Sequence, residues 1–242
     1  YGLICQELER GDSGLRSFVS VQSSLCMYPI YTYGSEQQKQ QYLPRMARGE
    51  VIGAIAMSEP GVGSDLQSVK TSAVQGADGH YVVNGAKTFI TNGWNADVVI
   101  VVAKTDPAAG AKGTSLLLVE RGMPGFETGK RLKKVGLKAQ DTAELFFNDV
   151  KVPVANLLGP LNRGFISLME QLPWERMQIA IGAVAKSQAA IEWTLAYVKD
   201  RKVFGQAVAQ YQNTRFKLAE LQTQVQIAQV FVDKCIELLL QD

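Results

Sequence analysis

The stretch Val51–Lys70, VIGAIAMSEPGVGSDLQSVK, decides how the rest of this chain is interpreted. An apolar run of strand length, Val51–Met57, breaks into a bend, Ser58–Asp65, that contains one proline and two glycines. Pro60 restricts one φ angle, whereas glycine permits left-handed angles or the close approach of another group. Such a bend directs backbone N–H groups and serine hydroxyls at one spot, which suits a phosphate or the polar edge of a flavin ring. From local chemistry alone, an ordinary turn is the alternative.

Composition indicates a globular protein of one large or two modest domains, with 242 residues of which 46% are hydrophobic. A net charge of +2 with interspersed signs argues against a nucleic-acid-binding surface. No apolar run approaches the roughly 18 residues that a membrane helix needs. Three cysteines without CxxC spacing predict reduced, buried thiols in an intracellular protein. The single histidine, His80, excludes a His-rich metal site, so any chemistry must use carboxylates, hydroxyls, backbone groups or a cofactor.

The hydrophobic periodicity changes twice along the chain. Residues 1–50 have helical spacing, including a capping box at Ser35-Glu36-Gln37-Gln38. Short strand-like runs follow from about Val51, separated by turn dipeptides such as Asp78-Gly79 and Asn84-Gly85. Helical spacing returns after Asn162, and we expect a long helix from about Trp174 to Lys202, ended by Phe204-Gly205, and a last helix from about Asn213.

This order predicts an α+β fold with three parts. The parts are the end of a helical domain (1–52), a central β-barrel or sandwich (53–158), and the start of a helical bundle (159–242). Neither end of the chain carries helix-capping residues, so we expect an internal fragment of a longer protein.

Two motifs closely resemble the flavin-binding elements of the acyl-CoA dehydrogenase family. The first is MSEPGVGSD, residues 57–65, and the second is NGAKTFITNG, Asn84–Gly93, which by itself would be a hairpin between two Asn-Gly turns. In the family, the second stretch packs an aromatic ring on the isoalloxazine, often a Trp where this chain has Phe89. The resemblance implies that the cofactor is FAD, with Ser64 also beside the substrate, and that the cofactor contacts are Met57, Ser58, Gly63, Ser64, Phe89, Ile90 and Thr91.

A third motif, Asp200–Gly205 followed by Gln212, reads locally as a basic helix end that complements the helix dipole. It resembles the family's R-x-x-F-G element, which reaches the ADP part of FAD in a neighbouring subunit. The resemblance therefore implies FAD contacts from Arg201, Phe204 and Gln212. It also implies a homo-oligomer, a tetramer built as a dimer of dimers.

The fourth motif, LPWER at Leu172–Arg176, reads locally as a helix cap with solvated charges. It resembles the isovaleryl and long-chain branches, and so implies that Glu175 is the catalytic base beside Pro173, Trp174 and Arg176. The implied reaction is α,β-dehydrogenation of an acyl-CoA to the trans-2-enoyl-CoA, with hydride passing to flavin N5. The implied electron acceptor is an electron-transferring flavoprotein, and the implied location is the bacterial cytoplasm or mitochondrial matrix.

The resemblance does not point to one branch. Residues 1–53 resemble the glutaryl-CoA branch, in which an Arg-Ser pair, here Arg16-Ser17, binds the distal carboxylate of the substrate. Residues 54–242 resemble branches that act on monoacyl substrates. A mosaic of two branches and an uncommon branch both fit this pattern. Rival functions are an acyl-CoA oxidase that uses O₂ and a non-catalytic protein that binds flavin or CoA.

Overall fold

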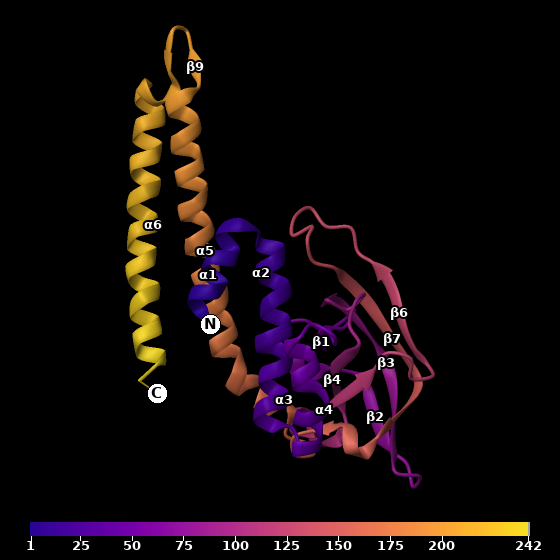
Figure 1. Cartoon of the computed structure of the whole chain (residues 1–242). Coiled ribbons are helices and arrows are strands. Elements are labelled where there is room, and N and C mark those ends of the chain that lie inside the picture. Colours follow the sequence, from indigo (N-terminus) through magenta and orange to yellow (C-terminus); the bar gives the residue numbers. More distant parts are fainter. Residues whose placement is uncertain (242) are drawn as a thin grey trace. The chain divides into compact units, whose positions relative to one another are not determined.

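The computed structural model describes residues 1–241 and divides the chain into two compact units (Figure 1). Unit 1 consists of Tyr1–Arg16 and Pro173–Asp242, and unit 2 of Ser17–Leu172. The helical ends and central sheet expected from the sequence are confirmed, whereas the three-domain boundaries stay a prediction. Among the described residues, no helix combines the length and apolar character that crossing a membrane requires.

Unit 1 is built on two long helices that run side by side, α5 and α6 (Figure 1). Their shared core consists of Ile181, Val184 and Val232, with partly buried residues such as Met177 and Val225 packed against it. The unit contains α1 (Gly2–Gly11), α5 (Gly164–Asp200, which begins in unit 2), β9 (Lys202–Val203), β10 (Gln206–Ala207), the 3₁₀ turn η5 (Val208–Gln210) and α6 (Gln212–Leu239).

The expected start of the long helix at Trp174 is wrong, because α5 runs unbroken through Pro173. A proline inside a helix removes one backbone hydrogen bond and costs about 3 kcal/mol. The apolar residues on both sides of Pro173 that pack into cores, such as Leu168 and Ile181, offset that cost.

The expected end of the long helix at Phe204-Gly205 is also wrong, because the helix stops at Asp200. Phe204 and Gly205 form the tight turn between β9 and β10, with φ angles of 51° and 82°.

In unit 2, α2, η1 and α3 follow one another without a break, α4 begins after Gly34-Ser35, and these helices are tied to the start of the sheet. The capping box is confirmed, because Gln38 N donates to Ser35 Oγ at 3.2 Å and Ser35 N donates to Gln38 Oε1 at 3.0 Å. Within a π-helical turn, the buried Gln22 amide accepts from Gly53 N at 2.7 Å and donates to the Val51 carbonyl at 2.8 Å. The elements are α2 (Ser13–Ser20, which begins in unit 1), η1 (Val21–Met27), α3 (Tyr28–Tyr33) and α4 (Glu36–Ala47).

The rest of unit 2 is one eight-stranded sheet with the order β6-β7-β3-β2-β4-β5-β8, to which β1 adds by pairing with β4 in parallel. One apolar core lies between the sheet and the helices, and a second lies on its other side, so every residue of β4 is buried. The strands are β1 (Gly53–Ala56), β2 (Ser72–Gln75), β3 (His80–Thr91), β4 (Val98–Lys104), β5 (Thr114–Glu120), β6 (Phe126–Arg131), β7 (Thr142–Pro153) and β8 (Leu157–Leu158), with 3₁₀ turns η2 (Leu66–Ser68), η3 (Pro107–Gly113) and η4 (Val154–Asn156).

The expected turn at Asn84-Gly85 is wrong, because both residues lie inside the continuous strand β3. The register with β7 shifts between Val83 and Gly85, which marks a β-bulge. A Cβ at Gly85 would lie 2.4 Å from Thr71 Oγ1, so glycine is required by the close approach of the neighbouring strand and not by a chain reversal. The other predicted turn, Asp78-Gly79, is present, with Gly79 at φ +78°.

Candidate functional site

The Ser58–Asp65 bend closes on itself through backbone hydrogen bonds. Glu59 N donates to the Val62 carbonyl at 2.9 Å, and Val62 N donates to the Glu59 carbonyl at 3.1 Å, with Pro60-Gly61 between them. Gly61 and Gly63 are exposed, and neither has a left-handed φ. A Cβ at either position would meet no protein atom within 4 Å. Neither glycine is therefore required by a left-handed backbone or by a neighbouring protein atom, and the backbone at both positions is open to an outside group.

A buried ion pair joins this bend to β3. Lys87 is 1% exposed, and its Nζ donates to Glu59 Oε1 at 2.9 Å and to the Met57 carbonyl at 3.0 Å. One residue further along β3, Thr88 N donates to the Ser58 carbonyl at 3.0 Å. These bonds fix the first flavin-like motif against the second, although the two lie far apart in the sequence.

Both oxygens of the buried Glu59 carboxylate accept hydrogen bonds from protein donors. Its Oε2 accepts from Lys70 N at 2.7 Å, and its Oε1 accepts from Thr71 N at 2.9 Å as well as from Lys87. Burial alone would raise the pKa of Glu59, but the hydrogen bonds from Thr71 and Lys70 and the charge of Lys87 outweigh it, so the pKa is lowered. Burial lowers the pKa of Lys87 to about 8, against the opposing effect of Glu59. Both groups are therefore charged at neutral pH.

Two exposed aromatic residues have the left-handed backbone that bulky side chains avoid. Phe89 is 69% exposed with φ +58°, and Phe204 is 95% exposed with φ +51°. At Phe89 the cause is a second bulge: three steps along β3 from Lys87 to Ile90 face two steps along β7. The bulge turns the Phe89 ring outward while Lys87 and Ile90 stay buried. Strained, exposed aromatics are typical of ligand-binding positions.

The other predicted flavin contacts of unit 2 differ in what they can offer. Met57 and Ser58 are half-buried at the start of the bend, Ser64 is exposed on it, and Thr91 is half-buried at the end of β3. Ile90 is 3% exposed and belongs to the core within the sheet, so only its backbone could reach a ligand.

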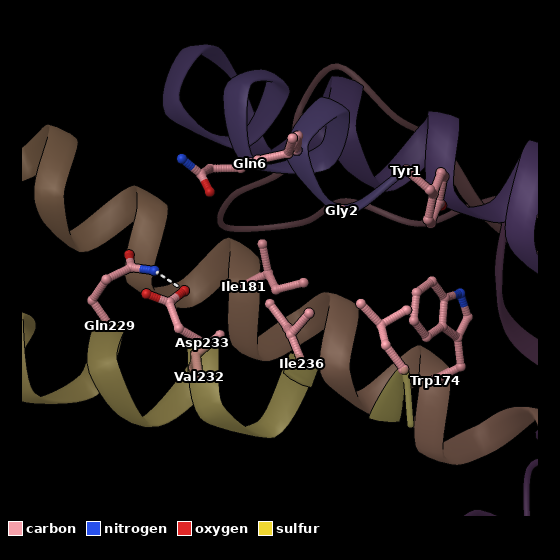
Figure 2. A pocket seen from close by; sticks show the side chains of 11 residues that line it. Tyr1, Gly2, Gln6, Trp174, Ile181, Gln229, Val232, Asp233 and Ile236 are labelled. Atoms are coloured by element: carbon pink, nitrogen blue, oxygen red, sulfur yellow. Dashed lines mark hydrogen bonds between the residues drawn. The ribbon is translucent and has the colours of Figure 1, made fainter. Parts of the chain in front are cut away.

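In unit 1, α5 carries the predicted base, Glu175, and three of the predicted substrate contacts. Glu175 and Trp174 are half-buried, whereas Pro173 and Arg176 are exposed. Figure 2 shows Trp174 beside a cavity of about 280 Å³, which α1, α5 and α6 line and whose wall includes a 2.7 Å hydrogen bond from Gln229 Nε2 to Asp233 Oδ1. Glu175 follows about 100° further around the helix and does not line this cavity.

The predicted FAD contacts Arg201, Phe204 and Gln212 come together at the hairpin that joins α5 to α6. All three are exposed. Two hydrogen bonds hold the hairpin to the segment that follows it. Tyr211 OH donates to the Val203 carbonyl at 2.8 Å, and Val208 N donates to the Arg201 carbonyl at 2.8 Å. A cation beside an exposed aromatic is a suitable surface for a nucleotide diphosphate.

Arg16, the predicted ligand of a distal carboxylate, is 8% exposed and bonded within unit 1. Its Nε donates to Glu9 Oε2 at 2.5 Å, and Lys186 Nζ lies 2.9 Å from Glu9 Oε1. Burial would raise the pKa of Glu9, but hydrogen bonds from Ser13, Arg16 and Lys186 lower it to about 2. Ser17, its predicted companion, is half-buried in unit 2.

Inspection of the sequence missed four residues that shape these sites: Glu59, Lys87, Asp141 and Glu9. Glu59 and Lys87 lie inside the two motifs, and that position was the available signal. Asp141 accepts from Trp94 N at 2.8 Å and from Asn95 Nδ2 at 2.9 Å, which fixes the chain that follows Thr91. No local pattern distinguishes Glu9 or Asp141 from a surface carboxylate.

Comparison with known proteins identifies relatives for nearly every part of the chain. Models of the acyl-CoA dehydrogenase N-terminal, middle and C-terminal domains match residues 1–50, 54–150 and 162–242. The mitochondrial long-chain specific acyl-CoA dehydrogenase of Sus scrofa is 53% identical over 222 residues, which are 90% of this chain and 51% of that protein. The chain spans about half the length of the curated relatives it matches.

Two solved structures show the same fold. An acyl-CoA dehydrogenase from Geobacillus kaustophilus is 47% identical with a TM-score of 0.94, covering 98% of this chain and 62% of that one. A glutaryl-CoA dehydrogenase from Mycobacterium smegmatis in complex with FADH2 is 40% identical with a TM-score of 0.89, covering 96% of this chain and 58% of that one.

Proposed function

Because this chain belongs to the acyl-CoA dehydrogenase family, we propose that it binds FAD and supplies the catalytic base for α,β-dehydrogenation of an acyl-CoA thioester. The observation that carries the proposal is the pair of motifs clamped together in unit 2. The open glycine backbone at Gly61 and Gly63 and the outward ring of Phe89 leave a surface that accepts a flavin. Residues that would hold FAD are Met57, Ser58, Gly63, Ser64, Phe89, Thr91, the backbone of Ile90, and Arg201, Phe204 and Gln212.

FAD, when bound, supplies the hydride acceptor for the reaction. The protein's own contribution is to take a proton and to orient the substrate. The carboxylate of Glu175 accepts the α-proton of the acyl group, while Pro173, Trp174 and Arg176 on the same helix contact the substrate. Loss of the β-hydrogen completes the trans-2-enoyl-CoA. Electrons then leave to an electron-transferring flavoprotein.

Arg16 supports a second candidate substrate, a dicarboxylyl-CoA such as glutaryl-CoA. It has the place in the sequence that binds a distal carboxylate in the glutaryl branch, and its guanidinium already donates to a carboxylate, that of Glu9. The negative charge of Glu9 beside it opposes a second carboxylate, which supports a monoacyl substrate. We therefore rank the monoacyl substrate first, as the similarity to the long-chain enzyme also supports.

We also propose that the working enzyme is an oligomer. Arg201, Phe204 and Gln212 are exposed at the α5–α6 hairpin, and in the family this element serves the FAD of a neighbouring subunit. Cofactor occupancy should then depend on protein concentration, which sedimentation of the FAD-loaded protein can measure.

The test is reduction of the bound flavin by acyl-CoA. The FAD-loaded protein is mixed with palmitoyl-CoA, isovaleryl-CoA and glutaryl-CoA, and bleaching of the flavin absorbance is followed. Glu175→Gln should keep FAD but slow bleaching by about 100-fold or more. Glu192→Gln is the matched control on the same helix, since Glu192 is an exposed carboxylate that pairs with Arg10. Unchanged bleaching in Glu175→Gln would assign the base elsewhere, and no bleaching of the wild type by any thioester would establish a non-catalytic flavoprotein.

A further inference from the structure

The connection between β6 and β7 contains the densest charge of the chain. Lys130–Lys138, KRLKKVGLK, contains five of the 25 basic residues and no acidic residue. We name this segment the basic loop; it comprises the last two residues of β6 and most of the long connection from β6 to β7 (Figure 1). Without it the chain would contain more acidic than basic residues, so its positive field is local.

The cations of the basic loop are available to a partner. Within residues 1–241, none of the five lies within 4.0 Å of a carboxylate oxygen. Four of them line a hollow of about 410 Å³, whose walls are Arg131, Leu132, Lys133, Lys134, Lys138 and Gln140. Lys134 Nζ donates to the Gln140 carbonyl at 2.6 Å, which holds the loop closed on itself.

The tip of the basic loop is apolar. Val135 is fully exposed, and Leu137 is 39% exposed with φ +52°. Apolar side chains ringed by charges are typical of protein-docking surfaces, where the partner buries the centre and the charges form the rim. A phosphate or other small anion would pair with the lysines but leave Val135 in water.

The loop is anchored directly to the proposed flavin site. Leu132 N donates to the Thr142 carbonyl at 2.8 Å, and Thr142 pairs with Thr91 across β7 and β3. At its other end, the Asp141 carbonyl accepts from Asn92 N at 3.2 Å, and the Asp141 carboxylate accepts from Trp94 N. A partner seated on the basic loop would therefore be held next to the residues that end the second flavin-binding motif.

From these observations we infer that the basic loop docks the protein that removes electrons from the flavin, through an acidic, partly apolar surface of that protein. The inference rests on the proposed function, since it needs a flavin that is reduced and reoxidised. Unpaired surface cations raise the rate of encounter with an acidic partner and lose this effect as salt screens them. The loop thereby selects a protein acceptor and has no part in the hydride step.

The experiment compares two electron acceptors with the FAD-loaded protein. Lys133→Glu/Lys138→Glu should raise the KM for an electron-transferring flavoprotein about tenfold at low ionic strength, and the difference should fall below about twofold near 1 M salt. Flavin bleaching by acyl-CoA and turnover with a small uncharged dye should stay within twofold of the wild type. Lys112→Glu, an exposed lysine of the β4–β5 connection, is the matched control and should leave the flavoprotein KM unchanged.

Three results would overturn the inference. Normal flavin bleaching with an unchanged flavoprotein KM in Lys133→Glu/Lys138→Glu would refute it while leaving the proposed function intact. An equal increase in KM for Lys112→Glu would show an effect of net charge alone. Retention of the wild type, but not of Lys133→Glu/Lys138→Glu, on vesicles of anionic phospholipid, with unchanged acceptor kinetics, would assign the loop to a lipid surface. Failure of the wild type to bleach at all would refute the proposed function itself.

Discussion

Replacing Lys87 with methionine tests whether the buried ion pair holds the two flavin-binding motifs together. Methionine fills most of the same volume but cannot donate to Glu59 or to the Met57 carbonyl. Glu59 would stay buried with two backbone donors, Lys70 N and Thr71 N. Breaking a buried pair from one side costs about 3–5 kcal/mol, and we expect the low end, about 3 kcal/mol, because those two donors remain.

Calorimetry of the FAD-free protein measures this loss. For a domain of this size, about 3 kcal/mol corresponds to a Tm lower by roughly 6–12 °C. The affinity for FAD should fall as well, because the bend that carries Ser58 would no longer be held against the strand that carries Phe89. In Glu59→Gln/Lys87→Met no unpaired carboxylate is left at this position, so the double variant should regain at least half of the lost stability.

The reasoning would be refuted if Lys87→Met unfolded within about 2 °C of the wild type and bound FAD equally well. Such a result would mean that the backbone bonds alone, including Thr88 N to the Ser58 carbonyl, hold the bend. A double variant that lost as much as the two single variants together would also contradict the argument, because it would show that Glu59 and Lys87 contribute independently.

Two other substitutions have distinct signatures. The folded pKa of Glu9 is about 2 against an ordinary 4.5, so the stability it contributes is complete above pH 4.5 and is lost as the pH falls toward 2. In urea unfolding, wild type should therefore lose about 2 kcal/mol more than Glu9→Gln between pH 6 and pH 3; equal losses would contradict the pairing with Arg16 and Lys186. Phe89→Asn relieves the left-handed strain, so the FAD-free protein should be as stable or up to about 1 kcal/mol more stable, while FAD affinity measured by fluorescence falls about tenfold. Unchanged affinity would exclude stacking by Phe89.

Much of the architecture could be predicted because it depends on local spacing. The capping box at Ser35, the turn at Asp78-Gly79 and the order of helices, strands and helices follow from residues close together in the chain. Local sequence patterns gave the wrong prediction where tertiary packing determines the backbone conformation. Asn84-Gly85 is a frequent turn dipeptide, yet here Gly85 lies within a strand because Thr71 approaches it. Pro173 interrupts helices in isolation, yet α5 continues through it.

The candidate site divides in the same way. The proposed cofactor contacts Ser58, Phe89 and Arg201 could be named from the sequence, because they lie in motifs that resemble those of the acyl-CoA dehydrogenase family. The buried residues that hold these motifs in place could not be named from the sequence. Lys87 and Glu59 are 28 positions apart, and nothing in either neighbourhood shows that the two charges share one buried space.

The sequence by itself determined the order of helical and strand regions, the family, and the motifs proposed to bind the cofactor, since these depend on periodicity and on short runs of specific side chains. Only the tertiary structure decided which charges are paired in the interior, where the bulge turns Phe89 outward, and that the basic loop is anchored beside Thr91. The physical reason is that burial and ion pairing are set by contacts between distant segments, whose free energies exceed any local preference.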